Sequence, residues 1–249
     1  QYDGNWVNLH PERILTGRAV TCRYVPLRPD LNALVQEEGE QNSRVGGQNS
    51  WVIDTLEEGD VLVVELFGKI EKGTFIGDNL GTAIATRTGG TGLIVDGSIR
   101  DTQRVAQLDM NVFCRGLHPS AIADVTMMEM NGPVRIGEAT VLPGDVVLGT
   151  PSGVVFVPPK FAAEVVEKSE ETRMRDYFGK MRIGEGVYTP GEVDRGWSDL
   201  MNEDYENWDL DDLEAEIMKK DAQDTDVSKL NKAEMIRSPR RWATGEIPP

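Results

Sequence analysis

The stretch that decides the fold reads DVLVVELF at residues 60–67, GDNLGTAIATRTGG at residues 77–90 and GLIVDGSIRD at residues 92–101. The first segment is a mostly apolar, β-branched run of the kind that forms a buried strand, and glycines interrupt the sequence after it. The second has apolar residues at helical spacing and ends on two glycines, which commonly stop helices. The third begins as another short buried strand. The sequence therefore predicts a strand–helix–strand unit.

This unit places several polar groups at one edge of a sheet. Strand–helix–strand units form parallel strand pairs, and ligands collect at the carboxyl ends of parallel strands. We expect Asp78 and residues 96–101 at that edge, with Asp78 or Asn79 as the cap of the intervening helix. Free amides at a helix N-terminus bind anions, so residues 77–80 are suited to a carboxylate or an enolate oxygen.

Arg100 and Asp101 follow the second strand and bring complementary chemistry. The guanidinium of Arg100 can pair with a carboxylate through two N–H groups, and the carboxylate of Asp101 is a hard oxygen ligand suited to magnesium or manganese. The same spacing is equally compatible with a surface role, in which the two residues cap a helix running through Val105 and Leu108. Spacing alone does not separate these two interpretations.

Two long stretches resemble one known family. They read GDNLGTAIATRTGGTGLIVDGSIRDTQRVAQLDMNVFCRGLHPSA at residues 77–121 and PVRIGEATVLPGDVVLGTPSGVVFVPP at residues 133–159. Both are similar to the family that contains regulator of ribonuclease activity A and the 4-hydroxy-4-methyl-2-oxoglutarate/4-carboxy-4-hydroxy-2-oxoadipate aldolases. In those aldolases a Gly-Asp/Glu-x-Leu turn is followed, one helix and one strand later, by Arg-Asp. The matching residues here are Asp78, Leu80, Arg100 and Asp101.

The resemblance implies a role for each matched residue. Asp101 would ligate a divalent cation, Mg²⁺ or Mn²⁺, directly, and Asp78 would hold a water molecule bound to that cation. Arg100 would bind the pyruvyl carboxylate and steady the enolate. The substrate would also contact backbone amides of the turn, at Gly77, Asn79 and Leu80.

The resemblance also implies that the site is shared between subunits. An acidic residue from the C-terminal helix of a neighbouring subunit normally completes the water shell. On the helix expected at residues 160–180 the candidates are Glu170, Glu171 and Asp176. These residues lie far along the chain from Arg100, so the site should be shared, and the resemblance implies a homotrimer or a hexamer. The regulator branch lacks the metal-binding aspartate after the arginine, so Asp101 favours an enzyme.

The implied reaction is that of a class II pyruvate aldolase, which cleaves a 4-hydroxy-2-oxo acid to pyruvate. A divalent cation chelated by the carboxylate and keto oxygens stabilises the enolate that forms when the bond between the third and fourth carbons breaks. Decarboxylation of oxaloacetate generates the same enolate and is an expected second activity. The alternative is a non-catalytic oligomeric binding or regulatory protein of the same fold.

Charge and composition limit the partners. The chain has 249 residues with 42 acidic and 26 basic side chains, a formal net charge of −16, so we expect no nucleic-acid partner. No apolar run approaches the length of a membrane span, so we expect no membrane partner. A small 2-oxo acid is the expected ligand. The chain begins at Gln1 without a methionine, so export from the cytoplasm is one expected location. A cytoplasmic location is slightly favoured over it.

The remaining pattern fits an α/β fold, a layered β/β/α sandwich of the swivelling-domain type that the resemblance implies, with a helical C-terminal extension. A strand is expected at residues 14–26 and a Gly-, Asn- and Gln-rich loop at residues 37–50. Short strands punctuated by proline and glycine are expected at residues 131–157. The helix at residues 160–180 should face the interior with three apolar residues, Phe161, Val165 and Val166.

Composition changes beyond residue 185. We place the aldolase domain at residues 1–184 and an acidic C-terminal extension at residues 185–249. The extension carries three aromatic residues before an acidic run at residues 209–216. These aromatic residues are Trp197, Tyr205 and Trp208. We expect a solvated helix whose aromatic side chains pack on the same or a neighbouring subunit, and the alternative is a tail that shapes the substrate site across an interface.

Three further features each have two interpretations. The two cysteines lie in strand-like sequence and are expected as buried free thiols, with a mutual disulfide as the alternative. His118 precedes a proline and is expected in a structural turn, with a substrate-facing role as the alternative. Arg28 and Asp30 flank a proline, and a salt bridge within that turn is expected rather than a place in the substrate site.

Overall fold

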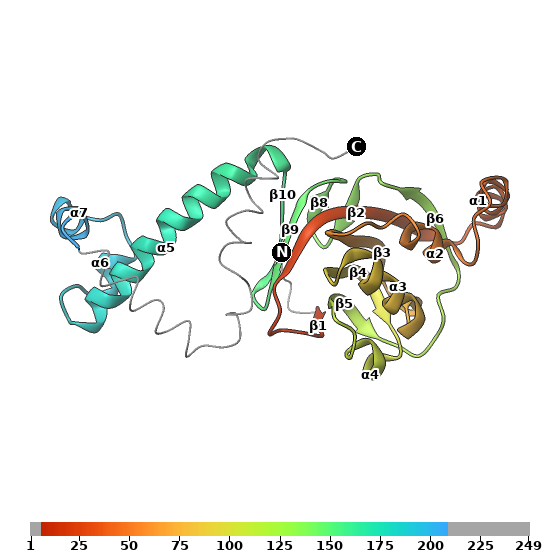
Figure 1. The fold of residues 1–249 in the computed structure, drawn as a ribbon, viewed down its shortest axis with the longest axis horizontal. Helices are drawn as coiled ribbons and strands as arrows, with labels where there is room; N and C mark the ends of the chain where they lie inside the picture. The colour runs from red at the N-terminus through yellow and green to blue at the C-terminus, as the bar shows by residue number, and fades with distance from the viewer. Residues whose placement is uncertain (1–5, 209–249) are drawn as a thin grey trace. The chain divides into compact units, whose positions relative to one another are not determined.

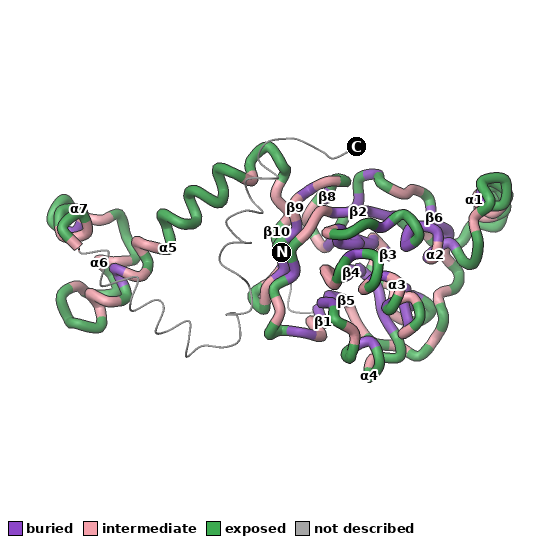
Figure 2. Tube along the Cα trace, viewed as in Figure 1, coloured by how far each residue is buried: buried purple, intermediate pink, exposed green. Residues whose placement is uncertain are grey.

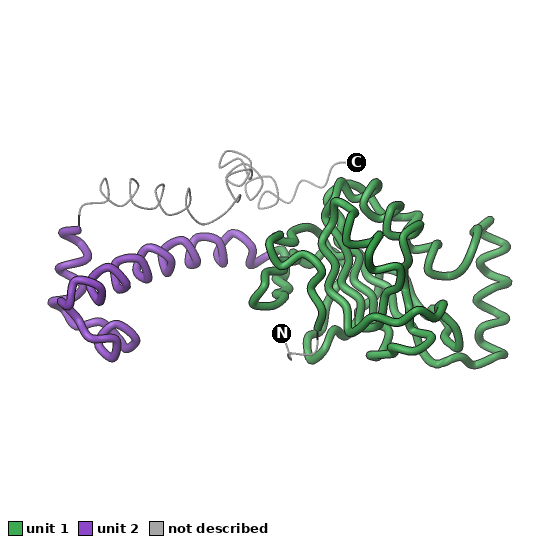
Figure 3. Tube along the Cα trace, turned by 90° about the horizontal axis from the view of Figure 1, so that it is seen from below, with its two compact units in different colours: residues 1–159 green, residues 160–249 purple. Residues whose placement is uncertain are grey.

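The computed structural model describes residues 6–208. The chain divides into two compact units, residues 1–159 and residues 160–249, drawn in different colours in Figure 3. The first unit contains the predicted sheet, and the described part of the second is helical. The boundary between the units thus falls after Pro159, and the extent of the aldolase domain to residue 184 stays a prediction.

Four parallel strands form the centre of the first unit (Figure 1). They are β2 (Leu15–Pro26), β3 (Asp60–Ile76), β4 (Gly92–Ile99) and β5 (Asn111–Leu117), and they lie side by side in the order β5, β4, β3, β2. Helix α3 (Asp78–Thr88) connects β3 to β4 and ends at Gly89, whose φ of 68° is a left-handed conformation that glycine adopts readily. The predicted strand–helix–strand unit is confirmed.

Antiparallel strands extend this sheet. They are β1 (Val7–Asn8) beside β5, β6 (Val125–Met130) and β9 (Val146–Thr150) beside β2, and β10 (Gly153–Val157) beside β9. A separate two-stranded sheet consists of β7 (Val134–Ile136) and β8 (Ala139–Val141). The short strands expected at residues 131–157 are therefore present, whereas β6 has no counterpart among the predicted strands. The expected layered α/β fold is confirmed.

Both faces of the parallel sheet are buried, which explains why its strands are almost continuously apolar. Along β3 the side chains alternate, so that Leu62 and Val64 join one apolar cluster while Val61 and Val63 join another. The first cluster contains side chains of helices α2 (Gln48–Ile53) and α3, and the second contains side chains of β7 and β8. Figure 2 shows this burial along the central strands.

The prediction of a loop at residues 37–50 is wrong, because most of these residues are helical. Helix α1 (Pro29–Gln41) and helix α2 occupy its two ends, which leaves residues 42–47 between them. Gly39 lies inside α1, and Trp51 packs directly on it: a Cβ at Gly39 would lie 2.3 Å from Cη2 of the Trp51 ring. The glycine that indicates a loop in the sequence therefore permits a close contact between a helix and an aromatic ring.

Strand β3 extends to Ile76 rather than ending at Phe67. Its backbone bends at Phe67 and Gly68, with φ values of 42° and 72°, and its pairing with β4 shifts register in this region. Lys69 lies beside Gly97 and Thr74 beside Ser98, and Ile76 then lies beside Ile99, the last residue of β4. The two strands consequently end together at the same edge of the sheet.

The second unit is built on α5 (Ala162–Gly184), which is followed by α6 (Pro190–Val193) and α7 (Asp199–Glu206). Phe178 is fully buried, and the ring centroids of three aromatic residues lie 5.3–5.4 Å from its own. These are Trp197, Tyr205 and Trp208. The aromatic residues of the extension therefore pack on the same chain, one of the two expected arrangements. The acidic run at residues 209–216 lies outside the described residues.

Three apolar residues of this unit were predicted to face the interior, but in the single chain their side chains are exposed. Phe161, Val165 and Val166 have exposed fractions of 44%, 45% and 37%. The aromatic core contacts the C-terminal part of α5, so the N-terminal part is exposed on all sides (Figure 2). Within the described residues, no helix combines the length and the apolar character that crossing a membrane requires.

The cysteines and the Arg28 turn have one of their two expected arrangements. Cys22 and Cys114 are buried and free. Burial raises the pKa of the Cys114 thiol to about 12 and that of Cys22 further still. Arg28 donates two hydrogen bonds to the carboxylate of Asp30, at 2.9 and 2.8 Å, which is the expected salt bridge within the turn.

Candidate active site

The common end of β3 and β4 brings together two segments that are far apart in the sequence. Ile76 and Ile99 are paired, so Gly77 and Asp78 follow one strand where Arg100 and Asp101 follow the other. The backbone N–H of Arg100 donates to the carbonyl oxygen of Ile76 at 3.0 Å, which extends the pairing by one residue. The edge predicted from the sequence is therefore present, with Asp78, Arg100 and Asp101 at it.

Gly77 is the residue on which this arrangement depends. It is the N-cap of α3, without a side-chain capping bond, so the expectation that Asp78 or Asn79 caps the helix is wrong. A Cβ on Gly77 would lie 2.3 Å from Oδ2 of Asp101 and 3.0 Å from Nε of Arg100. The carboxylate and the guanidinium thus occupy the space that a side chain at Gly77 would take.

The carboxylate of Asp101 lies next to Gly77 and does not cap the helix that follows. Its Oδ2 lies 3.4 Å from Nε of Arg100, and each side chain is about two-fifths exposed. Asp101 is the N-cap residue of α4 (Thr102–Val105), yet its side chain accepts no capping hydrogen bond. Its φ of 52° is a left-handed conformation that few non-glycine residues adopt, although aspartate is among them. Asp101 therefore begins a helix, as in the surface interpretation, but the helix ends at Val105 and the carboxylate does not cap it.

Asp78 is the first residue of α3, and both of its carboxylate oxygens accept hydrogen bonds. Oδ2 accepts from Nη1 of Arg104 at 2.8 Å, and Oδ1 accepts from the backbone N–H of Asn79 at 3.0 Å. The Arg104 guanidinium, with the Asn79 amide, holds the pKa of Asp78 below its ordinary value. Asp78 is therefore a carboxylate at neutral pH. The side chain of Leu80 packs against the apolar core and anchors this turn.

Arg104 is the site residue that the sequence interpretation missed. Its backbone N–H donates to the carbonyl oxygen of Asp101 at 2.9 Å, while its guanidinium reaches Asp78. Arg104 therefore connects the two segments that carry the carboxylates. The only signal in the sequence is its position, three residues after Asp101 in the first turn of a helix that begins where a strand ends.

Two residues near this edge have structural roles. Asp96 lies inside β4 rather than at its end and is 2% exposed, so its expected place at the edge is wrong. One of its oxygens accepts a hydrogen bond from Nε of Arg115 at 2.7 Å, which compensates the buried charge. Nδ1 of His118 accepts the backbone N–H of Ser120 at 3.2 Å, so His118 stabilises a turn, as expected.

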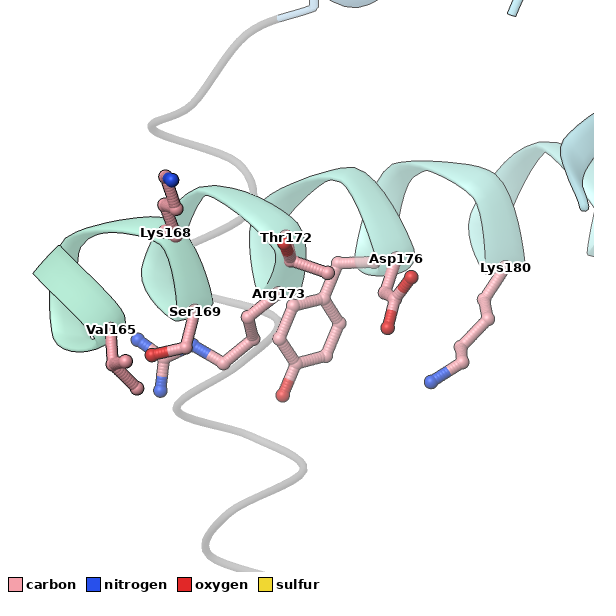
Figure 4. A pocket seen from close by; sticks show the side chains of 8 residues that line it. Val165, Lys168, Ser169, Thr172, Arg173, Asp176 and Lys180 are labelled. Atoms are coloured by element: carbon pink, nitrogen blue, oxygen red, sulfur yellow. The ribbon is translucent and has the colours of Figure 1, made fainter. Parts of the chain in front are cut away.

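The three acidic candidates for the water shell lie on α5 in the second unit. Glu170 and Glu171 are exposed, and so is Asp176, which lines a shallow hollow along the helix. Figure 4 shows Asp176 projecting from the same side of α5 as Arg173 and Lys180. The structure contains a single chain, so the choice among the three acids, and their contribution from a neighbouring subunit, stay predictions.

The donor groups at Gly77 suit a magnesium or manganese ion. Among residues 6–208 no group of three or more His, Cys, Asp or Glu side chains could enclose a metal. Mg²⁺ does not need such a cage, because it keeps several waters and binds through one or two carboxylates plus oxygens of the substrate. Asp101 supplies one accessible carboxylate and Asp78 a second nearby, which matches that requirement and not the closed ligand sets of structural zinc.

Comparison with known proteins supports the same family as the sequence. The family model RraA-like, described as Aldolase/RraA, matches residues 1–156. A protein of Halalkalibacterium halodurans named "Putative 4-hydroxy-4-methyl-2-oxoglutarate aldolase" is 28% identical over 144 residues, which are 57% of this chain and 68% of that protein. One of the same name from Azotobacter vinelandii is 34% identical over 119 residues, which are 48% of this chain and 70% of that protein.

Solved structures show the same fold. Streptomyces coelicolor RraAS2, described as an unusual member of the RNase ES inhibitor RraA protein family, superposes with a TM-score of 0.59 at 29% identity, over 72% of this chain and 83% of that one. An uncharacterized protein from Pseudomonas syringae pv. tomato superposes with a TM-score of 0.61 at 24% identity, over 76% of this chain and 79% of that one. The chain therefore belongs to the RraA-like family, Aldolase/RraA.

Proposed function

We propose that this protein is a metal-dependent carbon–carbon lyase that cleaves 4-hydroxy-2-oxo acids to pyruvate. The observation that carries the proposal is that the side chains of Asp101 and Arg100 lie side by side next to Gly77. A carboxylate suited to a hard cation thus adjoins a guanidinium suited to a carboxylate. A chelated 2-oxo acid needs both. The aldolase names of the relatives from H. halodurans and A. vinelandii support the same assignment.

Arg100 binds the carboxylate of the 2-oxo acid. Its side chain is 43% exposed, so N–H groups of the guanidinium are open to a ligand although Nε lies near Asp101. A guanidinium presents its donors in a planar fork that matches the two oxygens of a carboxylate. Arg100 thereby orients the first two carbons of the substrate toward Asp101.

Asp101 would hold a divalent cation, and the absence of a side chain at Gly77 leaves room for the Asp101 carboxylate. A divalent cation held there would supply Lewis-acid stabilisation of the negative charge that carbon–carbon cleavage leaves on the pyruvyl fragment. The backbone amides at the start of α3 follow Gly77 directly, and that of Asn79 donates to Asp78. The helix N-terminus favours the negative charge that develops on the substrate.

Asp78 orients the group that receives the proton of the 4-hydroxyl. It is ionised, because Arg104 and the Asn79 amide lower its pKa, so it is a hydrogen-bond acceptor rather than a proton store. A carboxylate has about four acceptor positions, and two bonds occupy Asp78 here. A further position can accept a water molecule, which relays the hydroxyl proton to solvent as the bond between the third and fourth carbons breaks.

Loss of carbon dioxide from oxaloacetate leaves the same enolate, so oxaloacetate decarboxylase activity follows from the same site. The experiment that tests the proposal is a coupled assay of pyruvate release. The substrates are a small panel of 4-hydroxy-2-oxo acids and oxaloacetate, each with magnesium, with manganese and with a chelator. We expect turnover with either metal and none with the chelator.

Asp101→Ala separates this proposal from the non-catalytic alternative. The variant should have no activity that ordinary metal concentrations restore. The matched control is Asp109→Ala, since Asp109 is an exposed aspartate that precedes the amino end of β5, away from the carboxyl edge of the sheet. Full activity of Asp101→Ala would refute the proposed role, and no turnover of any substrate by the unaltered protein would favour a binding or regulatory protein.

A further inference from the structure

Regular pairing of β3 stops well before the strand reaches the candidate site. The pairing with β2 ends at Glu65. The pairing with β4 is continuous only as far as Val64, and three separate pairs follow it, the last of which joins Ile76 to Ile99. The segment that leads into Gly77 is therefore not fixed by a continuous ladder on either side.

A side chain supplies a hydrogen bond where the ladder does not. The N–H of Arg100 donates to the carbonyl oxygen of Ile76, so that carbonyl points toward β4. Successive carbonyl groups of an extended strand point to opposite sides, so the Phe75 carbonyl points away from β4, to the side on which pairing with β2 has ended. Nδ2 of Asn49 donates to this buried carbonyl oxygen at 2.8 Å. The Asn49 amide thus takes the place of a neighbouring strand.

Asn49 lies on a helix that is anchored on its other side. It belongs to α2 and is 9% exposed. The preceding residue, Gln48, accepts the backbone N–H of Met127 in β6 at 2.6 Å and donates to Oδ1 of Asn32 in α1 at 2.9 Å. Two adjacent amide side chains therefore connect α2 to β6 and α1 in one direction and to the end of β3 in the other.

The hydrogen bond to Phe75 bears on the site because Gly77 follows only two residues later. A buried carbonyl group that loses its donor is costly, and the backbone that carries it shifts toward another donor or toward water. Such a shift at Phe75 would move Gly77 relative to the carboxylate of Asp101, which lies next to it. It would also disturb the hydrogen bond that joins Ile76 to the backbone of Arg100.

We propose that Asn49 is a positioning residue of the active site, whose amide holds the end of β3 so that Gly77 adjoins Asp101 and Arg100 in the geometry that binds cation and substrate. The inference rests on the proposed function for what the site binds. Asn49 acts through the backbone of β3 and not through a contact with either ligand. An amide suits this role, because it donates a hydrogen bond without bringing a charge into the interior.

The experiment compares Asn49→Ala with Gln48→Ala. Both residues are buried amides of α2, with exposed fractions of 9% and 8%, so both variants should lower the thermal unfolding temperature. Only Asn49 bonds to β3. For Asn49→Ala we expect the Kd of Mn²⁺, measured by electron paramagnetic resonance, to rise at least about fivefold and kcat/KM for pyruvate release to fall at least about tenfold. For Gln48→Ala we expect changes of less than about twofold in both quantities.

A second pair of variants keeps the size of both side chains. Asn49→Asp has no donor for the Phe75 carbonyl and should lose at least as much as Asn49→Ala, whereas Gln48→Glu keeps the oxygen that accepts from Met127 and should again change little. This pair allows the same comparison if an alanine variant does not fold.

The Mn²⁺ measurement separates failure of this inference from failure of the proposed function, because it needs no turnover. Weaker Mn²⁺ binding in the Asn49 variants alone, with no turnover of any substrate by the unaltered protein, would refute the lyase and retain the positioning role. Equal losses in the Asn49 and Gln48 variants would overturn the inference, and so would Asn49 variants that match the unaltered protein in Mn²⁺ affinity and kcat/KM. Absence of Mn²⁺ binding by the unaltered protein would overturn both.

Discussion

Gly77→Ala tests the geometry of the site with the smallest possible change. The backbone of Gly77, with φ of −119° and ψ of −161°, is extended and open to alanine, so the substitution strains no dihedral angle. The added Cβ would lie 2.3 Å from Oδ2 of Asp101, about 1 Å short of the 3.4 Å at which ordinary contacts begin. The flexible carboxylate can move away by that amount, so we expect the fold to survive and the cation ligand to be displaced.

A displacement of about 1 Å in an active site can cost on the order of 100-fold in rate. We therefore expect kcat/KM for pyruvate release to fall about 100-fold, which corresponds to about 2.7 kcal/mol of lost transition-state stabilisation. The half-saturating magnesium concentration should rise as well. Steady-state assays over a magnesium titration measure both quantities, and thermal unfolding checks that the fold is retained.

Gly184→Ala is the matched control, because nothing lies within 4 Å of a Cβ at Gly184, at the end of α5. Its activity should equal that of the unaltered protein, with stability equal or slightly higher, since alanine favours helices over glycine. If Gly77→Ala kept full activity and an unchanged magnesium requirement, the carboxylate of Asp101 would not act from the position the structure gives it. The argument for Asp101 as the cation ligand would then be refuted.

Three further predictions concern the chemistry, the thiols and the assembly. Arg100→Lys should lower kcat at least about 100-fold, because lysine keeps the charge but loses the planar fork, and steady-state kinetics that changed less than about twofold in both kcat and KM would contradict this. Cys22 and Cys114 should not react with a thiol reagent at pH 8 unless the protein is unfolded. Burial keeps both thiols protonated in the folded protein, so the free energy of unfolding should fall as the pH rises above the ordinary thiol pKa of 9.0. The expected fall is up to about 1.4 kcal/mol per pH unit per thiol. Denaturant titrations would disprove this if the protein and a variant with both cysteines changed to alanine showed the same pH dependence. Val165→Glu, on the exposed apolar part of α5, should weaken assembly and activity together, and sedimentation that finds a fully active monomer of the unaltered protein would exclude a shared site.

Local pattern was enough to predict the elements that carry the site. The apolar run of β3, the helical spacing of α3 and the glycines at its end depend on residues near one another in sequence. Each strand begins where it was expected, although β3 and β4 both extend beyond their expected ends. The parallel pairing of β3 with β4 followed from their connection by a helix. These facts place Asp78, Arg100 and Asp101 at one edge without knowledge of any distant contact.

The structural roles of glycines and charged residues were predicted less well, because these roles depend on contacts with residues that are distant in the sequence. Gly39 indicates a loop by composition, yet it lies inside a helix, where the absence of a side chain makes room for the Trp51 ring. The sequence predicts Asp96 among the polar residues that follow β4. Strand pairing instead extends β4 to Ile99, so Asp96 is buried inside the strand, where it accepts a hydrogen bond from Arg115. In both cases a tertiary contact outweighs the local signal.

Sequence patterns were enough to predict the family fold, the strand–helix–strand unit and the polar residues that follow its two strands. How those residues contact one another depends on three-dimensional packing. Arg104 reaches Asp78 across 26 positions of sequence, and the carboxylate of Asp101 lies over Gly77. Both contacts require β3 to run on to Ile76 through a shifted register, so that it ends beside β4. Register and strand length are set by packing across the whole sheet, which no local propensity encodes.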